Sequence, residues 1–267
     1  MTGKDTADLA ALWDVAELLA DAARDATLPH FRSAGLAADN KDPAGFDPVT
    51  EADRAAEARM RALLAEHRPD DAILGEEMGE TPGRSGLTWV LDPIDGTRAF
   101  MSGAPTWGVL IALSDAGGPV LGIIDQPYIG ERFLGGPDRA EMRGPRGDRR
   151  LATRGTRRLE DATIFTTYPD LGSPAETASF NALAARTRLT RYGIDCYAYA
   201  MLALGQIDLV VEAELKPYDI QAPMAVVQAA GGVVTGWDGG PAHRGGRVLA
   251  AANPEIHARA LEILHNT

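Results

Sequence analysis

The segment WVLDPIDGT, residues 89 to 97, holds the side chains best suited to chemistry. Asp92 and Asp95 follow an apolar run typical of a buried strand, and ligand sites in α/β sheets gather where strands end. Pro93 restricts the backbone, so we expect Asp95 to return toward the side of Asp92, with the Ile94 carbonyl between them. These hard oxygen ligands suit magnesium better than zinc or copper. A turn held by aspartate side-chain hydrogen bonds accounts for the two residues equally well.

Gly96 and Thr97 continue this turn in a way that favours phosphate binding. If a helical turn begins here, their N–H groups point outward beside the carboxylates, and glycine permits close approach of a ligand. A phosphate held there would bridge bound cations and the backbone.

Glu76 and Glu77 follow the apolar run AIL, at another expected strand end. Adjacent side chains of an extended segment point opposite ways, so we expect only one of the pair to face a site directly. An exposed acidic turn is the alternative interpretation of both.

Asp53 and Asp219 also allow two interpretations. Thr50 with Asp53 three positions later resembles a capping box, although the same position can aim Asp53 at a neighbouring hydroxyl such as that of Thr97. Asp219 stands at the start of an apolar helix, where N-capping is the alternative to metal binding. Pro223 is close enough to the first turn not to forbid that helix.

The joint pattern of these carboxylates favours bound cations. Two unit charges 4 Å apart repel by about 4 kcal/mol at an effective dielectric of 20, and metal ions remove that penalty. Competing motifs are absent from the sequence. Ile94 breaks the EF-hand pattern, the chain has no Walker A sequence and no HExxH, and the single cysteine has no nucleophile signature.

Composition and charge narrow the class of protein. The net charge of -12 repels phosphate backbones and anionic lipids, so we expect no nucleic-acid partner and no membrane partner. The only cysteine, Cys196, excludes an intrachain disulfide and is typical of a reducing compartment. With no signal-peptide pattern and no apolar run of spanning length, the sequence predicts a cytoplasmic enzyme.

The elements that must position these residues follow from the apolar spacing. It predicts a helix over residues 6–28 and another from Thr50 to Pro69, then several strands from residue 72, paired antiparallel where connections are short. For the arginine-rich segment 143–158 a solvated loop or hairpin is favoured over an anion patch. Strands and helices alternate after it. We expect helices over a mixed sheet and then a second α/β layer, as halves 1–150 and 151–267 of one catalytic unit.

Taken in order, the motifs DPVTEAD, GEE, WVLDPIDGT and KPYDIQAPMAVVQAAGG resemble the magnesium-dependent, lithium-sensitive phosphatase superfamily typified by inositol monophosphatase. They span most of the chain from residue 41 to residue 232. The resemblance implies an α/β (α+β) fold, a layered αβαβα sandwich of the inositol monophosphatase/fructose-1,6-bisphosphatase type, which is usually a homodimer.

The resemblance also implies two to three Mg²⁺ ions as cofactors. Glu76, Asp92 and the Ile94 carbonyl would hold one ion, and Asp92, Asp95 and Asp219 a second. A third, weaker ion would lie near Glu76.

The remaining roles implied by the resemblance concern phosphate and water. Thr97 paired with Asp53 would activate the attacking water, and the backbone at Gly96 and Thr97 would cradle the phosphate. Lys41 and Glu77 would support the site from behind its ligands or from a loop.

A narrower resemblance concerns the substrate. YGIDCYAYAMLALGQIDLVVEAELKPYD, DGTRAFMSGAPTWG and IDQPYIGERFLGG look like the histidinol-phosphate phosphatase branch, which acts in histidine biosynthesis. Its substrate has an amine and an imidazole, and the resemblance places Asp195 and Glu212 at that cationic end, where ammonium–carboxylate hydrogen bonds are charge-assisted. A turn or N-cap before CYAYAM is the alternative for Asp195. This chain departs from the branch pattern at Ile194 and Glu214, where the branch has glycine.

The activity implied is Mg²⁺-dependent hydrolysis of a small phosphomonoester, with histidinol phosphate as the leading substrate. An inositol or sugar-phosphate phosphatase is one alternative. A non-catalytic regulatory protein of the same fold is another, although every expected metal carboxylate is present.

Overall fold

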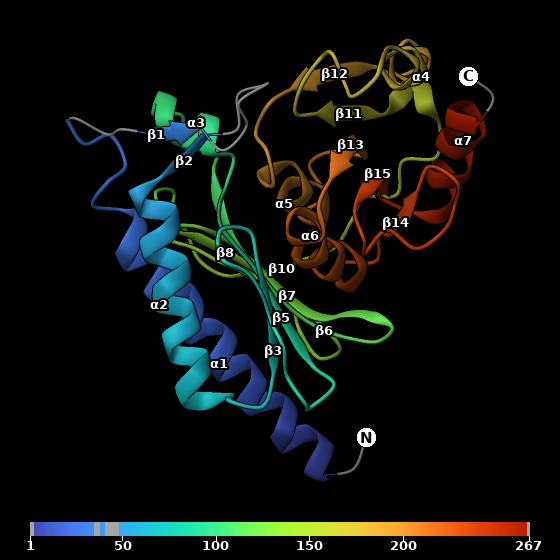
Figure 1. Ribbon diagram of the computed structural model, residues 1–267. Coiled ribbons are helices and arrows are strands. Elements are labelled where there is room, and N and C mark those ends of the chain that lie inside the picture. The colour runs from blue at the N-terminus through green and yellow to red at the C-terminus, as the bar shows by residue number, and fades with distance from the viewer. Residues whose placement is uncertain (1–2, 35–37, 41–47, 266–267) are drawn as a thin grey trace.

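The computed structural model describes residues 3–34, 38–40 and 48–265 of the chain. Within these ranges, pairs of helices alternate with two sheets in five layers (Figure 1). The α/β class and the αβαβα order predicted from the sequence are therefore confirmed. None of the described helices combines the length and apolar character needed to cross a bilayer.

The larger sheet has the strand order β10-β9-β8-β7-β6-β5-β3-β4. Its strands are β3 (Ala72–Gly75), β4 (Gly79–Thr81), β5 (Thr88–Asp95), β6 (Gly108–Asp115), β7 (Gly118–Gln126), β8 (Glu131–Gly135), β9 (Ala140–Arg143) and β10 (Arg149–Arg150). Neighbours pair antiparallel except β3 and β5, which are parallel because the chain reverses twice, through β4, before it enters β5. β9 and β10 form a hairpin within the arginine-rich segment.

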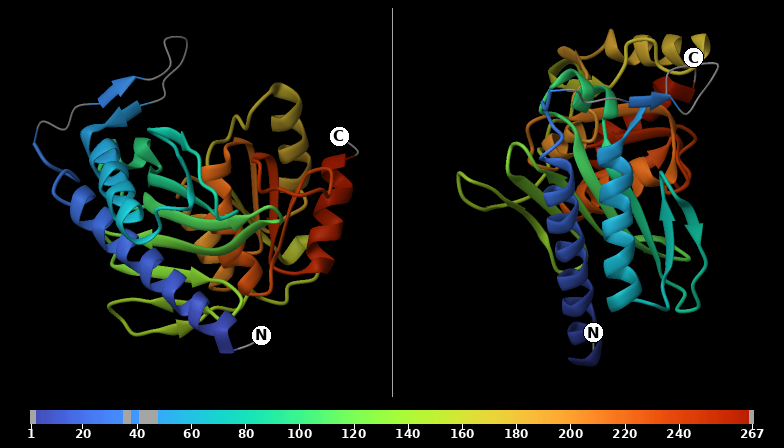
Figure 2. Two further views of the ribbon diagram at one scale, coloured as in Figure 1. Left: turned by 60° about the horizontal axis from the view of Figure 1, so that its bottom comes forward. Right: turned by 60° about the vertical axis from the view of Figure 1, so that its left-hand side comes forward.

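Two helices, α1 (Gly3–Thr27) and α2 (Glu51–His67), cover the outer face of this sheet (Figure 2). Their buried apolar side chains recur at helical spacing: Leu9, Ala16, Leu19 and Ala23 on α1, and Ala52, Ala56, Met60 and Leu64 on α2. Ahead of α2, β1 (Ala38–Asn40) pairs antiparallel with β2 (Pro48–Thr50). The sequence predicted only a turn-rich loop there, because strands this short leave no periodic pattern.

The middle layer consists of α5 (Tyr197–Ala203) and α6 (Pro217–Ala229), which lie between the two sheets (Figure 1). α6 packs against β6 and β7 on one side and β14 on the other. It approaches the larger sheet very closely, since a Cβ added at Gly135 would lie 2.3 Å from the Cα of Val226. Glycine at that position therefore sets the depth at which α6, and with it Asp219, sits over the sheet.

The smaller sheet has the order β12-β11-β13-β15-β14. Its elements and the outermost helices are η1 (Leu159–Asp161), β11 (Thr163–Thr166), α4 (Pro174–Ala184), β12 (Leu189–Tyr192), β13 (Leu209–Leu215), β14 (Val233–Gly236), β15 (Gly246–Ala251) and α7 (Pro254–His265). β11 runs parallel to β12 and β13, whereas β15 is antiparallel to its neighbours. Three buried apolar clusters fill the space between the layers. The division into halves at residue 150 stays a prediction.

Candidate active site

Asp92 and Asp95 lie on the same side of β5 because the strand contains a bulge. In a regular strand, residues three positions apart point to opposite faces. Here Asp92 pairs with Leu110 and Asp95 with Gly108, so three steps along β5 match two along β6, and one extra residue is inserted. The N–H of Ile94 also donates to Asp92 Oδ1 at 3.0 Å. The hydrogen-bonded turn and the pair of converging carboxylates are therefore both present.

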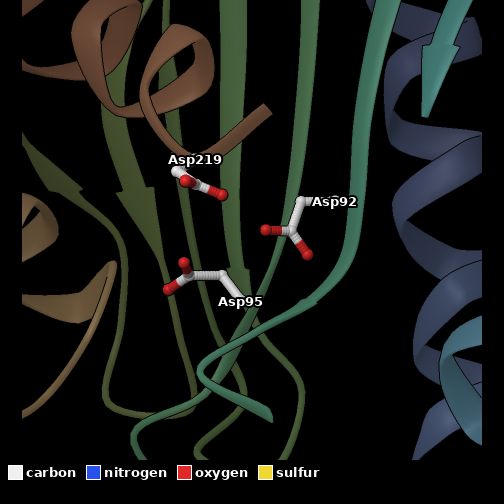
Figure 3. Close-up of side chains that lie close together, drawn as sticks. All are labelled: Asp92, Asp95 and Asp219. Atoms are coloured by element: carbon white, nitrogen blue, oxygen red, sulfur yellow. The ribbon is translucent and has the colours of Figure 1, made fainter. Parts of the chain in front are cut away.

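Asp219 reaches this pair from the first turn of α6. The helix begins at Pro217 and its N-cap is Lys216, so Asp219 is the third helical residue and not the first. One of its oxygens accepts the N–H of Lys216 at 2.6 Å. Ligand atoms of Asp92, Asp95 and Asp219 all lie within 4.8 Å of one another. Figure 3 shows the three carboxylates gathered around one point between β5 and α6.

Glu76 extends the cluster from the end of β3. Its carboxyl group lies against that of Asp92, with which it shares a hydrogen bond. Of the two adjacent glutamates, Glu76 lines the pocket around the aspartates and Glu77 does not. The backbone of Glu77 instead donates its N–H to Glu57 at 2.7 Å.

Glu57 on α2 was missed in the sequence, although it anchors the turn that carries Glu76. Its side chain is fully buried and accepts the N–H groups of Glu77 and Met78 at 2.7 and 3.1 Å. It also pairs with Arg61 at 2.7 Å. An acidic residue on the otherwise apolar face of a helix was the available signal, because such a residue is stable only with buried partners.

A short helix, α3 (Thr97–Ser102), begins directly after the bulge. Gly96 precedes it with φ 83°, in the left-handed region that favours glycine. The Thr97 hydroxyl donates to the Ile94 carbonyl at 3.2 Å. The helical turn on which the expected phosphate site depends is thus present, and phosphate binding by Gly96 and Thr97 remains a prediction.

Asp53 takes part in the capping box at the start of α2. Its buried carboxylate accepts the N–H of Thr50 at 2.9 Å and bonds the Thr50 hydroxyl. Asp53 does not line the pocket, and its pairing with Thr97 remains a prediction. Lys41 lies outside the described residues.

Asp195 and Glu212 both line the pocket that holds the aspartate cluster. Glu212, on β13, is almost fully buried and is held by the end of β11. The Thr166 hydroxyl donates to its Oε2 at 3.1 Å, and the N–H and hydroxyl of Thr167 donate to its Oε1 at 2.8 and 2.9 Å. Asp195 precedes α5 and lies against Gly96, where an added Cβ would come within 2.7 Å of the Asp195 Cγ.

The two departures from the branch pattern fall on left-handed backbone. Ile194 has φ 70° and Glu214 has φ 61°, and Asp195, which directly follows Ile194, has φ 45°. Glu214 sits in a bulge of β13, where Glu212 pairs with Val248 but Leu215 pairs with Gly246. Glycine is favoured at such positions because it has no Cβ to clash with the backbone. Both side chains therefore add backbone strain beside the pocket.

Burial raises the pKa of Asp92 and of Asp95 well above the usual aspartate value. The charges of Glu76, Asp95 and Asp219 raise the pKa of Asp92 further, and those of Asp195 and Asp219 raise that of Asp95. The cluster without cations therefore tends to retain protons, which a divalent cation would replace.

The pKa values of two further carboxyl groups in the pocket, those of Asp195 and Glu212, are shifted too. Burial raises the pKa of Asp195 to about 6, against a hydrogen bond from Thr106 and the charge of Arg98, which lower it. Burial raises the pKa of Glu212 to about 7, against the bonds from Thr167 and Thr166. A bound cation would favour the charged form of both carboxylates.

The pocket has a volume of about 350 Å³, which suits a small-molecule ligand. It gathers most of the site residues predicted from the sequence: Glu76, Asp92, Ile94, Asp95, Gly96, Thr97, Asp195, Glu212 and Asp219. It is also lined by Tyr199, which the sequence did not single out. A tyrosine within an apolar helix gives no local sign of which way it faces.

Comparison with known proteins gives a consistent picture. A family model described as the inositol monophosphatase family matches residues 6–267. Bifunctional phosphatase IMPL2, chloroplastic, of Arabidopsis thaliana is 38% identical over 262 residues, which cover 94% of this chain and 74% of that protein. A histidinol-phosphatase of Streptomyces coelicolor is 36% identical over 260 residues, covering 94% of this chain and 96% of the relative.

Among solved structures, an inositol monophosphatase from Zymomonas mobilis superposes with a TM-score of 0.83 and 41% sequence identity. The superposition covers 94% of this chain and 96% of that one. Sequence and structure thus point to the same group of phosphatases, in which relatives named for different substrates are about equally similar to this chain.

Proposed function

The chain belongs to the inositol monophosphatase family and is a phosphatase of that family, and we propose that its substrate is L-histidinol phosphate, hydrolysed to L-histidinol and phosphate with Mg²⁺ as cofactor. The observation that carries this proposal is the presence of Asp195 and Glu212 in the same pocket as Asp92, Asp95 and Asp219. The aspartate cluster suits a metal-bound phosphate, and the two further carboxylates in the same pocket suit an ammonium group.

The residues at the phosphate end fit magnesium. All the donors are carboxylate or carbonyl oxygens, the ligand type that magnesium prefers, and three of the carboxylates have atoms within 4.8 Å of one another. The raised pKa values of Asp92 and Asp95 support this assignment, because a bound cation would offset the repulsion among these carboxylates. We assign two to three ions to Glu76, Asp92, the Ile94 carbonyl, Asp95 and Asp219. When bound, they would lower the pKa of water and stabilise the departing alkoxide.

The chain's own residues would then position the phosphate and the attacking water. The N–H groups of Gly96 and Thr97 would bind phosphate oxygens, since α3 starts at Thr97 beside the carboxylates. The Thr97 hydroxyl would orient the water, take its proton and pass its own hydroxyl proton to the Asp53 carboxylate paired with it. Lys41 and Glu77 would support this arrangement from outside the pocket. Phosphoryl transfer needs mainly such positioning and charge neutralisation.

Two further buried carboxylates in the pocket favour a cationic substrate. Asp195 and Glu212 have raised pKa values because burial penalises their negative charge, so an ammonium group that pairs with them relieves this penalty. Inositol phosphates carry no cation and would leave both carboxylates uncompensated. The Streptomyces relative named histidinol-phosphatase supports the same choice.

The test is a comparison of kcat/KM for histidinol phosphate and for myo-inositol 1-phosphate, each with Mg²⁺ and with a chelator. We expect the first substrate to be preferred at least tenfold and both activities to disappear without Mg²⁺. A preference for inositol phosphate would instead establish the inositol monophosphatase alternative, which the 41% identity to the Zymomonas enzyme favours. No turnover of any phosphomonoester would point to the non-catalytic alternative.

A cytoplasmic location and a homodimer belong to the same proposal. Both are common expectations for this family, and the molar mass in solution tests the second directly. A mass close to 28.3 kDa would exclude the dimer.

A further inference from the structure

Tyr199 carries a buried hydroxyl that no described residue satisfies. The side chain is 3% exposed, and its oxygen has no hydrogen-bond partner within the described part of the chain. A buried hydroxyl without a partner is unfavourable, because its hydrogen bonds with water are lost and not replaced. Tyr199 lines the pocket, so a ligand bound there can supply the missing partner.

Tyr199 shares the pocket with Glu212, which we assign to the substrate's ammonium group. Glu212 is the charged group that most raises the pKa of Tyr199 after burial, ahead of Asp95 and Asp219. Asp195 in turn lies close enough to Glu212 to raise the pKa of Glu212. Tyr199, Glu212 and Asp195 therefore border one region of the pocket.

The number of free hydrogen-bond acceptors on Glu212 limits how it can bind an ammonium group. A carboxylate offers about four lone-pair sites, and three of those on Glu212 are already taken by Thr166 and Thr167. Glu212 can then accept about one further N–H. An ammonium group carries three N–H donors, so one bond to Glu212 and one to Asp195 leave one donor over. The oxygen of Tyr199, which has no partner among the described residues, can accept it.

We propose that Tyr199 is a specificity residue whose hydroxyl accepts the third N–H of the substrate ammonium group, completing a three-acceptor site with Asp195 and Glu212. The inference rests on the proposed function, because it assumes an ammonium-bearing phosphomonoester. Thr166 and Thr167 are positioning residues in this arrangement, since they fix the Glu212 carboxylate from behind and leave one acceptor site open.

The experiment compares Tyr199→Phe with Tyr197→Phe. Positions two apart on a helix point in nearly opposite directions, and the Tyr197 hydroxyl donates to Glu131 at 2.7 Å outside the pocket. The substrates are histidinol phosphate and its analogue without the amine, 3-(imidazol-4-yl)propyl phosphate. For Tyr199→Phe we expect KM for histidinol phosphate to rise about tenfold or more, because a hydrogen bond to a charged group is lost. KM for the analogue should be unchanged. Tyr197→Phe should change neither.

The thermal unfolding midpoint of the ligand-free protein is a second measurement. A purely structural role of the Tyr199 hydroxyl would lower this midpoint in Tyr199→Phe, whereas the proposed role would not. Tyr199→Phe removes an unsatisfied hydroxyl, so its midpoint should stay the same or rise by about 2 °C. Tyr197→Phe removes a satisfied one, so its midpoint should fall. A lower midpoint for Tyr199→Phe would overturn the inference, as would equal losses with both substrates, which would place the hydroxyl at the phosphate end.

The outcomes separate this inference from the proposed function. If the wild-type protein does not prefer histidinol phosphate over the analogue, the substrate proposal itself fails. If the wild-type protein shows that preference and Tyr199→Phe keeps it, only the role of Tyr199 is rejected.

Discussion

The main-chain N–H of Cys196 donates to a carboxylate oxygen of Asp95 at 2.6 Å, across 101 positions of sequence. Asp95 belongs to the aspartate cluster that we propose binds Mg²⁺, and Cys196 directly follows Asp195, which we propose binds the substrate's ammonium group. The hydrogen bond lowers the pKa of Asp95 against the larger effect of burial. The segment proposed to select the substrate is thereby hydrogen-bonded to a proposed metal ligand, so a shift in the backbone of one should move the other.

Gly96→Ala tests this close packing. An added Cβ would lie 2.7 Å from the Cγ of Asp195, on backbone with φ 83°. We expect unfolding free energy to fall by more than the roughly 1–2 kcal/mol of left-handed strain, and KM for histidinol phosphate to rise because Asp195 is displaced. Gly79→Ala is the matched control, since Gly79 has φ 67° with nothing within 4 Å. Equal stability losses and an unaltered KM would show that Gly96 does not set the position of Asp195.

Glu214→Gly should stabilise the protein. Glu214 is exposed and has φ 61° in the β13 bulge, so glycine removes left-handed strain of about 1 kcal/mol without loss of buried surface. Glu214→Ala removes the same carboxylate but keeps the Cβ, so it separates strain from charge. Chemical denaturation of both variants measures the difference. If alanine stabilises as much as glycine, charge and not strain is responsible. Ile194 is less suitable because it packs partly against the core.

The metal-free protein should lose stability as pH rises. The pKa of Glu212 is about 7 in the folded protein against an ordinary value of 4.5, so the folded state holds the extra proton between these values. The protonated Glu212 contributes up to roughly 3 kcal/mol to the free energy of unfolding. This contribution is fully present below about pH 4.5 and is lost as the pH rises through 7. Urea denaturation in chelator from pH 4.5 to 8 should show a smaller decline for Glu212→Gln than for wild type. Identical slopes would contradict the buried, proton-binding state of Glu212.

Asp92→Asn should abolish activity while leaving the fold intact. The amide keeps an acceptor for the N–H of Ile94, but it removes a carboxylate from the cluster. We expect turnover to fall at least about 100-fold and the Mg²⁺-induced rise in the unfolding midpoint to shrink. Unchanged turnover would reject the site assignment.

Asp71→Asn is the control for this variant. Asp71 is equally buried but bonds Arg68 and Trp89 at 2.7 and 2.9 Å, away from the pocket. It should lower stability and leave the Mg²⁺ effect intact.

Much of the architecture follows from local pattern. Apolar spacing in the first 69 residues predicted α1 and α2, and the apolar run before Asp92 predicted the buried strand that carries it. The resemblance carried by four motifs in order, WVLDPIDGT among them, led to the correct family. These features are readable because a helix repeats every 3.6 residues and a strand every two, so neighbours in sequence report them directly.

The tertiary structure decided which residues meet. Only the bulge against β6 turns Asp95 to the side of Asp92, and only the depth of α6 over the sheet brings Asp219 to both. The direction of Tyr199 into the pocket could not be read from sequence, because it depends on packing between segments far apart along the chain. Spacing determines which face of an element a side chain occupies, whereas the partner of that face is set by how the layers pack.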